Sequence, residues 1–144
     1  MKKKILLLSA LLSILSFLSL IILFIYLALM SGTHHYKYDD VFSYWLYTPH
    51  TLKNAPKISS DVEYSYYYDL DNQQKTVVIT WRDISNVSKG KEYLIDFLQQ
   101  LSPAIRSDCL WVYHDPNDYS NNYQRYCVYK KWDSLELEYF ETLK

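Results

Sequence analysis

The sequence predicts an α+β protein: an N-terminal transmembrane helix followed by a small two-layer domain, with one helix packed on a mainly antiparallel sheet. Three observations lead to this class. Residues 5–30 form one apolar run. Later segments of strand length alternate polar and apolar side chains, and one stretch between them has helical periodicity. The chain has 144 residues, which leaves room for a single domain of about a hundred residues after the apolar run.

The apolar run predicts a membrane anchor. It contains no charged residue and no proline. As a helix it would measure roughly 39 Å, against about 30 Å of bilayer hydrocarbon. A cleavable secretory signal has a shorter apolar stretch and a small-x-small cleavage site, which the residues around Met30 do not offer. We therefore expect an uncleaved single-pass helix at residues 5–30, with processing near Gly32 as the alternative.

Charge predicts the orientation of this anchor. Residues 2–4 are lysines, whereas Lys37 on the other side is offset by Asp39 and Asp40. Positively charged flanks remain in the cytoplasm. We expect residues 1–4 to be cytoplasmic and the domain to lie across the membrane. A bacterial inner membrane and periplasm are favoured over a eukaryotic secretory membrane.

Residues 31–60 are interpreted as an aromatic stalk and linker. Tyr, Trp and Phe crowd residues 36–47 directly after the hydrocarbon span, and Tyr and Trp favour the headgroup layer. A short helix there could lie on the membrane or fold back on the domain, and the first is slightly favoured. Pro49 and Pro56 are typical of a linker that leads into the domain.

Residues 61–144 predict an extracytoplasmic domain with the element order β-β-α-β-β-β. The alternating or β-branched segments that predict strands are residues 62–70, 76–81, 107–114, 123–130 and 134–141. A helix capped by Ser85 or Ser88 runs to about Leu101, because apolar residues recur at helical spacing and Pro103 stops it. This helix should pack across the sheet.

The two cysteines predict a disulfide. If the loop at residues 115–121 closes a hairpin in which Tyr113 faces Tyr123, Cys109 lies opposite Cys127. Cysteines in that relation on antiparallel strands are close enough to bridge. Such a bridge stabilises by about 3 kcal/mol in the chain-entropy model. Disulfides persist in oxidising compartments, which agrees with the orientation that the lysines predict.

Composition argues against several functions. Without its three N-terminal lysines the chain carries 12 basic and 16 acidic side chains, a net charge of −4. A nucleic-acid binder needs clustered cations, so no nucleic-acid partner is expected. The chain has two glycines, too few for the glycine-rich loops that cradle phosphates.

No catalytic or metal-binding set of residues is predicted. Cys109 and His114 are the only thiol and base close in sequence, and their odd spacing along a strand places them on opposite faces. His34 and His35 lie in a stretch that fixes no coordination geometry. We expect no enzyme activity, no metal and no cofactor, and an envelope enzyme is the least favoured alternative.

Sixteen tyrosines are the unusual feature of the sequence. Tyrosine offers a large contact area with a polar tip and is enriched at recognition surfaces. On the first predicted strand, a role in the core is favoured for most tyrosines. The candidate protein-binding residues are Tyr67, Tyr113, Tyr119 and Tyr123, and the loop at residues 115–122 is the expected binding edge.

These observations favour a non-catalytic periplasmic protein-binding module. Its expected partners are the lipid bilayer, through residues 5–30, and another protein of the envelope. In size and layout the chain is similar to small anchored immunity proteins, a resemblance that implies neutralisation of an envelope-targeting toxin. The alternative is a structural or assembly subunit of an inner-membrane complex.

Overall fold

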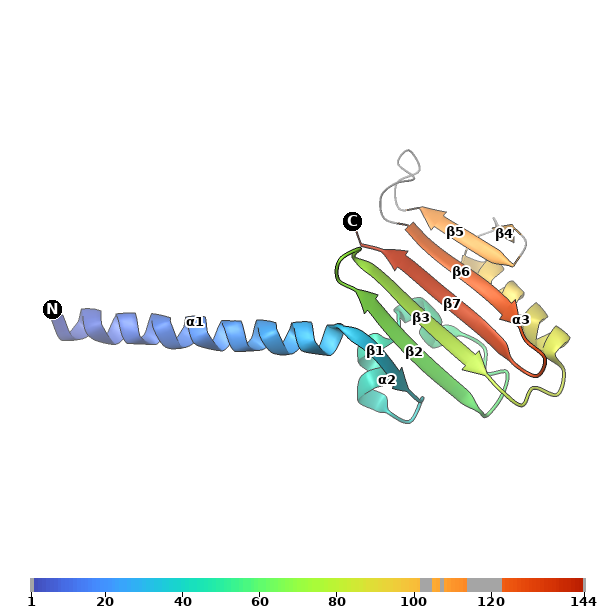
Figure 1. Ribbon diagram of the computed structural model, residues 1–144, viewed down its shortest axis with the longest axis horizontal. Coiled ribbons are helices and arrows are strands. Elements are labelled where there is room, and N and C mark those ends of the chain that lie inside the picture. The colour runs from blue at the N-terminus through green and yellow to red at the C-terminus, as the bar shows by residue number, and fades with distance from the viewer. Residues whose placement is uncertain (1, 102–104, 107, 114–122, 144) are drawn as a thin grey trace. The chain divides into compact units, whose positions relative to one another are not determined.

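The computed structural model describes residues 2–101, 105–106, 108–113 and 123–143 (Figure 1). Side chains are described for these residues except at 2–8, 10, 105, 106 and 113. The chain divides into two compact units, Met1–Ser31 and Gly32–Lys144.

The first unit is a single helix, α1 (Lys2–Met30). Its segment Leu11–Met30 is long and apolar enough to cross a membrane, and no other helix among the described residues meets that criterion. Large apolar side chains are exposed all along this segment. A helix that is apolar on every side fits a lipid environment, so the predicted anchor segment folds as a helix of the required type.

The second unit is built on a seven-stranded antiparallel sheet with the spatial order β1-β2-β3-β7-β6-β5-β4 (Figure 1). The strands are β1 (Gly32–Tyr36), β2 (Val62–Asp69), β3 (Gln74–Trp81), β4 (Ile105–Arg106), β5 (Cys109–Tyr113), β6 (Tyr123–Lys130) and β7 (Leu135–Thr142). All five predicted strands are present, with ends shifted by two residues at most. The short edge strands β1 and β4 were not predicted.

One face of the sheet, here called the covered face, carries the core. It is covered by α3 (Val87–Leu101) and by the connection at residues 41–60, which contains α2 (Val41–Tyr47) and the short 3-10 helix η1 (His50–Asn54). Alternate strand residues bury their side chains there: Tyr36, Tyr64, Tyr66, Val77, Ile79, Trp81, Leu110, Tyr126, Val128, Leu135, Leu137 and Tyr139. The domain is therefore α+β and two-layered, as the alternation predicted.

Helix α3 lies close to the sheet because a glycine faces it. A Cβ atom at Gly90 would lie 2.8 Å from Leu135 Cδ1 and 2.9 Å from Ile58 Cγ2. The cap of this helix differs from the prediction of Ser85 or Ser88. Asn86 Oδ1 accepts a hydrogen bond from the Lys89 backbone N–H at 3.0 Å, and asparagine caps a helix as well as serine does.

The slightly favoured interpretation of residues 31–60 as a stalk and linker was wrong, and the alternative, in which a short helix folds back on the domain, is the one that the structure has. Residues 32–36 form β1, which pairs with β2, and Tyr47 and Leu52 in the following segment are buried. Two tyrosines of this segment, Tyr36 and Tyr47, are buried in the core. Tyr36 stacks on Tyr64 with 5.4 Å between ring centroids, and its hydroxyl shares a 3.0 Å hydrogen bond with Thr48 Oγ1.

Candidate functional site

The second face of the sheet, here called the open face, carries the other half of the alternation. Both longer helices of this unit, α2 and α3, lie on the covered side (Figure 1). Open-face positions on the central strands are occupied by polar, charged and aromatic residues rather than by a continuous aliphatic core. Three aromatic side chains there, Tyr67, Trp111 and Tyr129, remain 41–46% exposed. Exposed aromatic rings on a rigid sheet are typical of recognition surfaces.

Four residues of the open face form a cluster, here called the aromatic cluster: Trp111, Tyr123, Arg125 and Phe140. Tyr123 links the two other rings, with centroid distances of 5.5 Å to Trp111 and 5.7 Å to Phe140. The Arg125 guanidinium carbon lies 5.2 Å from the Trp111 ring centroid and 5.0 Å from that of Phe140. The strand register produces this arrangement, because Arg125 pairs with Trp111 on one side and with Phe140 on the other.

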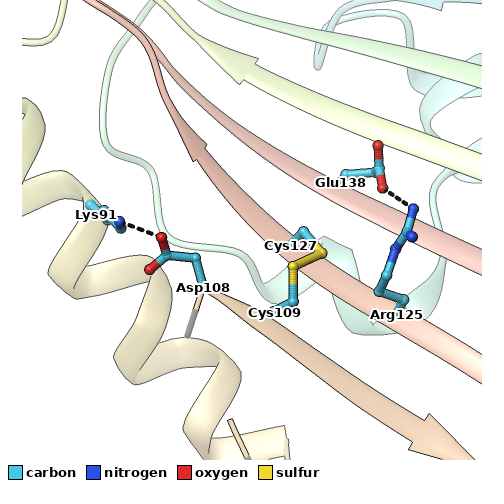
Figure 2. Close-up of a disulfide and its surroundings, with 6 residues drawn as sticks. All are labelled: Lys91, Asp108, Cys109, Arg125, Cys127 and Glu138. Atoms are coloured by element: carbon cyan, nitrogen blue, oxygen red, sulfur yellow. Dashed lines mark hydrogen bonds and ion pairs between the residues drawn. A yellow bond between two sulfur atoms is a disulfide. The ribbon is translucent and has the colours of Figure 1, made fainter. Parts of the chain in front are cut away.

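Arg125 is held in place by a carboxylate as well as by rings. Its Nη2 donates a 2.6 Å hydrogen bond to Glu138 Oε1 (Figure 2). Its Nε is buried and has no hydrogen-bond partner among the described residues. Charge-assisted contacts and stacking over aromatic faces both orient a guanidinium. The aromatic cluster is therefore a fixed surface rather than a set of independent side chains.

The predicted disulfide is present beside this cluster. Cys109 and Cys127 are bonded, with 4.2 Å between their Cα atoms, and both belong to the open face (Figure 2). The pairing of Cys109 with Cys127 and of Tyr113 with Tyr123 confirms the predicted hairpin register. The 2.7 Å ion pair between Lys91 of α3 and Asp108 fixes the residue that precedes β5.

The groups of the open face that could take part in chemistry are its cysteines and carboxylates. Both cysteines of the chain are in the disulfide, so neither is a free thiol in this structure, and His114 lies outside the described residues. The carboxylate of Glu63 is hydrogen-bonded to Arg82, which lowers the pKa of Glu63. Such a group stays ionised and does not serve as a general acid at neutral pH. No group of three or more metal-ligating side chains occurs in the part of the chain that is described.

The four tyrosines predicted to bind a partner have different positions in the structure. Tyr67 is on the open face and exposed, and Tyr123 is half-buried within the aromatic cluster. Tyr113 occupies the β5 position opposite Tyr123, and its side chain is not described. Tyr119 and the loop at residues 115–122 lie outside the described residues.

Sequence reasoning missed the other members of the aromatic cluster, Trp111, Arg125 and Phe140, and the carboxylate of Glu138 that holds Arg125. A signal for two of them was available, because the hairpin register in which Tyr113 faces Tyr123 also places Trp111 opposite Arg125. What that register does not contain is the neighbouring strand. The pairing of β6 with β7 is needed to bring Phe140 beside Arg125.

A separate cavity of about 440 Å³ opens between the connection at residues 37–62 and the covered face. Tyr44, Tyr64 and Trp81 contribute aromatic surface to it, and Lys37, Lys53 and Lys57 contribute ammonium groups, together with the carboxylates of Asp39 and Asp61. The cavity is within the usual size range of small-molecule sites. Its charges are mixed, and it shares no residue with the open face.

Comparison of the chain with known protein families, with characterised proteins and with solved structures found no match. The described part of the chain offers a partly exposed aromatic surface on the open face and a cavity beside α2.

Proposed function

We propose that this chain is a membrane-anchored, non-catalytic binding module that grips another protein with the open face of its sheet. The observation that carries the proposal is the aromatic cluster, whose rings are partly exposed and are held by strand pairing, a disulfide and an ion pair, together with the exposed ring of Tyr67 on the same face. Trp, Tyr and Arg are the residues most often found at the energetic centre of protein interfaces. Their fixed positions lower the entropy cost of binding.

Charge narrows the chemistry of the partner. The part of the chain after α1 has a net charge of −4. Glu63, Glu136 and Glu138 extend from the open face and pair, among the described residues, with Arg82, Lys131 and Arg125 respectively. A partner with a basic surface would approach faster and would not meet like-charge repulsion. The proposed partner is therefore a protein that presents Lys or Arg side chains toward these carboxylates.

The proposed location is the periplasmic side of a bacterial inner membrane, with the N-terminus in the cytoplasm. Two features support it: the three lysines that precede α1, and the disulfide in the second unit, which persists in an oxidising compartment. Within this class, the size and layout are similar to those of small anchored immunity proteins, and on that analogy we propose an envelope-targeting toxin as the partner.

Site-specific photo-crosslinking tests the proposal. A photoreactive phenylalanine analogue placed at Trp111 or Tyr67 of the full-length chain, expressed in its native cells, should give a crosslinked protein partner. The same analogue at Tyr93, which is similarly exposed but lies on α3, should not. Equal crosslinking at the three positions, or crosslinking at Tyr93 alone, would contradict the open face as the binding surface.

Alanine substitutions measure how much individual side chains of the open face contribute to the affinity for the partner. Trp111→Ala should weaken the affinity for the captured partner by about thirtyfold, the effect of losing a hot-spot side chain worth roughly 2 kcal/mol. Tyr93→Ala should leave the affinity unchanged. Exchange of α1 for an unrelated transmembrane helix distinguishes the proposal from the alternative, a bracing subunit of a membrane complex. The exchange should preserve the function of a module that binds with its open face, whereas it would abolish the function of a subunit that braces a complex through α1.

A further inference from the structure

Helix α2 has one face that packs on the sheet and one that does not. Tyr44 and Tyr47 point toward β2, with centroid distances of 5.3 Å to Tyr64 and 4.8 Å to Tyr66. The residues of the opposite face are large, apolar and 61–74% exposed: Val41, Phe42 and Trp45. Tyr38, just before the helix, is also more than half exposed. These four residues, Tyr38, Val41, Phe42 and Trp45, are here called the α2 patch.

The α2 patch is presented on a supported element. An isolated helix of seven residues would not be stable in water, so α2 depends on its neighbours. Asp40 caps it by accepting a 3.1 Å hydrogen bond from the Ser43 N–H. The buried ring of Tyr47 fixes the other end. The exposed residues are therefore held outward by tertiary contacts, which favours a surface that meets an apolar environment.

A lipid bilayer is the occupant that fits this patch best. Trp and Tyr prefer the headgroup layer of a membrane, where an apolar ring and a polar tip are both accommodated. The same chain carries a helix that can span a membrane and that ends at Met30, eleven residues before Val41. Because both elements belong to one chain, contact of the patch with that membrane is an intramolecular event at high effective concentration.

Cationic groups border the patch and fit the phosphate layer of a membrane. Lys53 Nζ donates a 3.2 Å hydrogen bond to the Trp45 carbonyl, and Lys57 Nζ lies 4.5 Å from the centroid of the Tyr38 ring. In the described part of the chain, neither ammonium group lies within 4.0 Å of a carboxylate. The carboxylates of Asp39 and Asp61 line the same cavity as these lysines and partly offset their charge. Apolar contact therefore contributes more to membrane binding than charge does, and anionic lipid is not required.

We propose that the α2 patch inserts into the headgroup layer of the membrane that α1 spans. This inference rests on the proposed anchor and adds an orientation to it. Because α2 lies on the covered side of the sheet (Figure 1), contact between α2 and lipid turns the open face away from the bilayer. The aromatic cluster is then presented to the aqueous compartment in which a soluble partner would arrive.

Tryptophan quenching by brominated lipid tests the orientation. The chain has four tryptophans and none of them is in α1. Trp45 belongs to the patch, Trp81 is buried in the core, and Trp111 and Trp132 are exposed elsewhere on the domain. Full-length protein is reconstituted in phosphatidylcholine vesicles with bromine near the headgroup end of the acyl chains. The fluorescence should be quenched relative to that in unbrominated vesicles.

Single-tryptophan substitutions show which tryptophan is quenched by the brominated lipid. Trp45→Phe should remove most of it, whereas Trp111→Phe and Trp132→Phe should leave it unchanged. Phe42→Asp should also reduce the quenching with little change in the unfolding temperature, because most of the Phe42 side chain is exposed. Quenching that disappears in Trp111→Phe instead would overturn the proposal, since the open face would then meet the bilayer.

The remaining outcomes separate this inference from the anchor. Protein that floats with the vesicles after an alkaline wash but shows no bromine quenching keeps the anchor and overturns the α2 contact. The patch would then be assigned to a protein partner. Protein that does not float overturns the anchor, and the α2 contact with it.

Discussion

The two faces of the sheet both carry aromatic rings, and they differ in what surrounds those rings. On the covered face, Tyr36, Tyr64 and Tyr66 are at most 8% exposed and stack against each other or against α2. On the open face, Trp111 and Tyr67 keep nearly half of their surface in contact with water. A high tyrosine content therefore identifies neither core nor binding surface. The layer above each ring decides which of the two roles it has.

The largest expected difference between the faces concerns a pair of tryptophans. Trp81 is buried on the covered face and Trp111 is exposed on the open face. Trp81→Ala should lower the free energy of unfolding by about 4 kcal/mol, through lost burial and the cavity that remains. Trp111→Ala should cost about 1 kcal/mol, chiefly the stacking on Arg125. Thermal unfolding of the full-length protein in mild detergent measures both.

Similar losses for the two variants would contradict the comparison. They would mean that a layer covers Trp111 as effectively as the helices cover Trp81, and the open face would then be part of the core rather than a surface for a partner.

A smaller effect is expected from the disulfide of the open face. Exchange of Cys109 and Cys127 for alanine should lower the free energy of unfolding by about 3 kcal/mol, because the bridge closes a loop with a sequence separation of 18 residues. The same loss should appear when the native protein is treated with a thiol reductant. The alanine variant supplies the control, because its unfolding temperature should not respond to the reductant.

Local sequence signals predicted most of the sheet, whereas elements that depend on distant pairing were missed. The register of β5 and β6 followed from two cysteines and a loop length, and the five longer strands followed from alternation, because these signals are local. Strand β1 carries Gly32, Thr33 and two histidines and has no apolar alternation, and only Tyr36 in it is fully buried. Its place in the sheet depends on pairing with β2, about thirty positions further along the chain.

The open face was only partly predictable for a related reason. Tyr67 and Tyr123 could be singled out by residue type, whereas the aromatic cluster needs β5, β6 and β7 side by side. The segment at residues 37–60 was misread because it has few aliphatic residues. Its core contacts are made by Tyr44, Tyr47 and Leu52, and two of these three are a residue type that also suits a membrane interface.

The smallest of the three expected effects on stability is the contribution of Glu141, a charged residue of the covered face, and it should depend on pH. Glu141 lies at the end of the covered face, where its carboxylate meets Lys75 Nζ at 2.5 Å and accepts a 3.1 Å hydrogen bond from Gln124 Nε2. Burial by itself raises the pKa of Glu141, but the hydrogen bonds from Lys75, Tyr139 and Gln124 outweigh it and lower the pKa below the ordinary value. A carboxyl group with a lowered pKa stabilises the fold above its ordinary pKa and loses that contribution as the pH falls through the folded-state value.

Glu141→Gln should therefore lower the free energy of unfolding by about 2 kcal/mol at pH 7, the range for removing one partner of a charged hydrogen bond. The difference from the native protein should shrink below a pH of about 4. The measurement is the unfolding temperature of both proteins from neutral to acidic pH, with Lys75→Met as a second variant that removes the same pair from its other side. Two curves that stay parallel down to acidic pH would show that Glu141 is not the group that couples the covered face to protons.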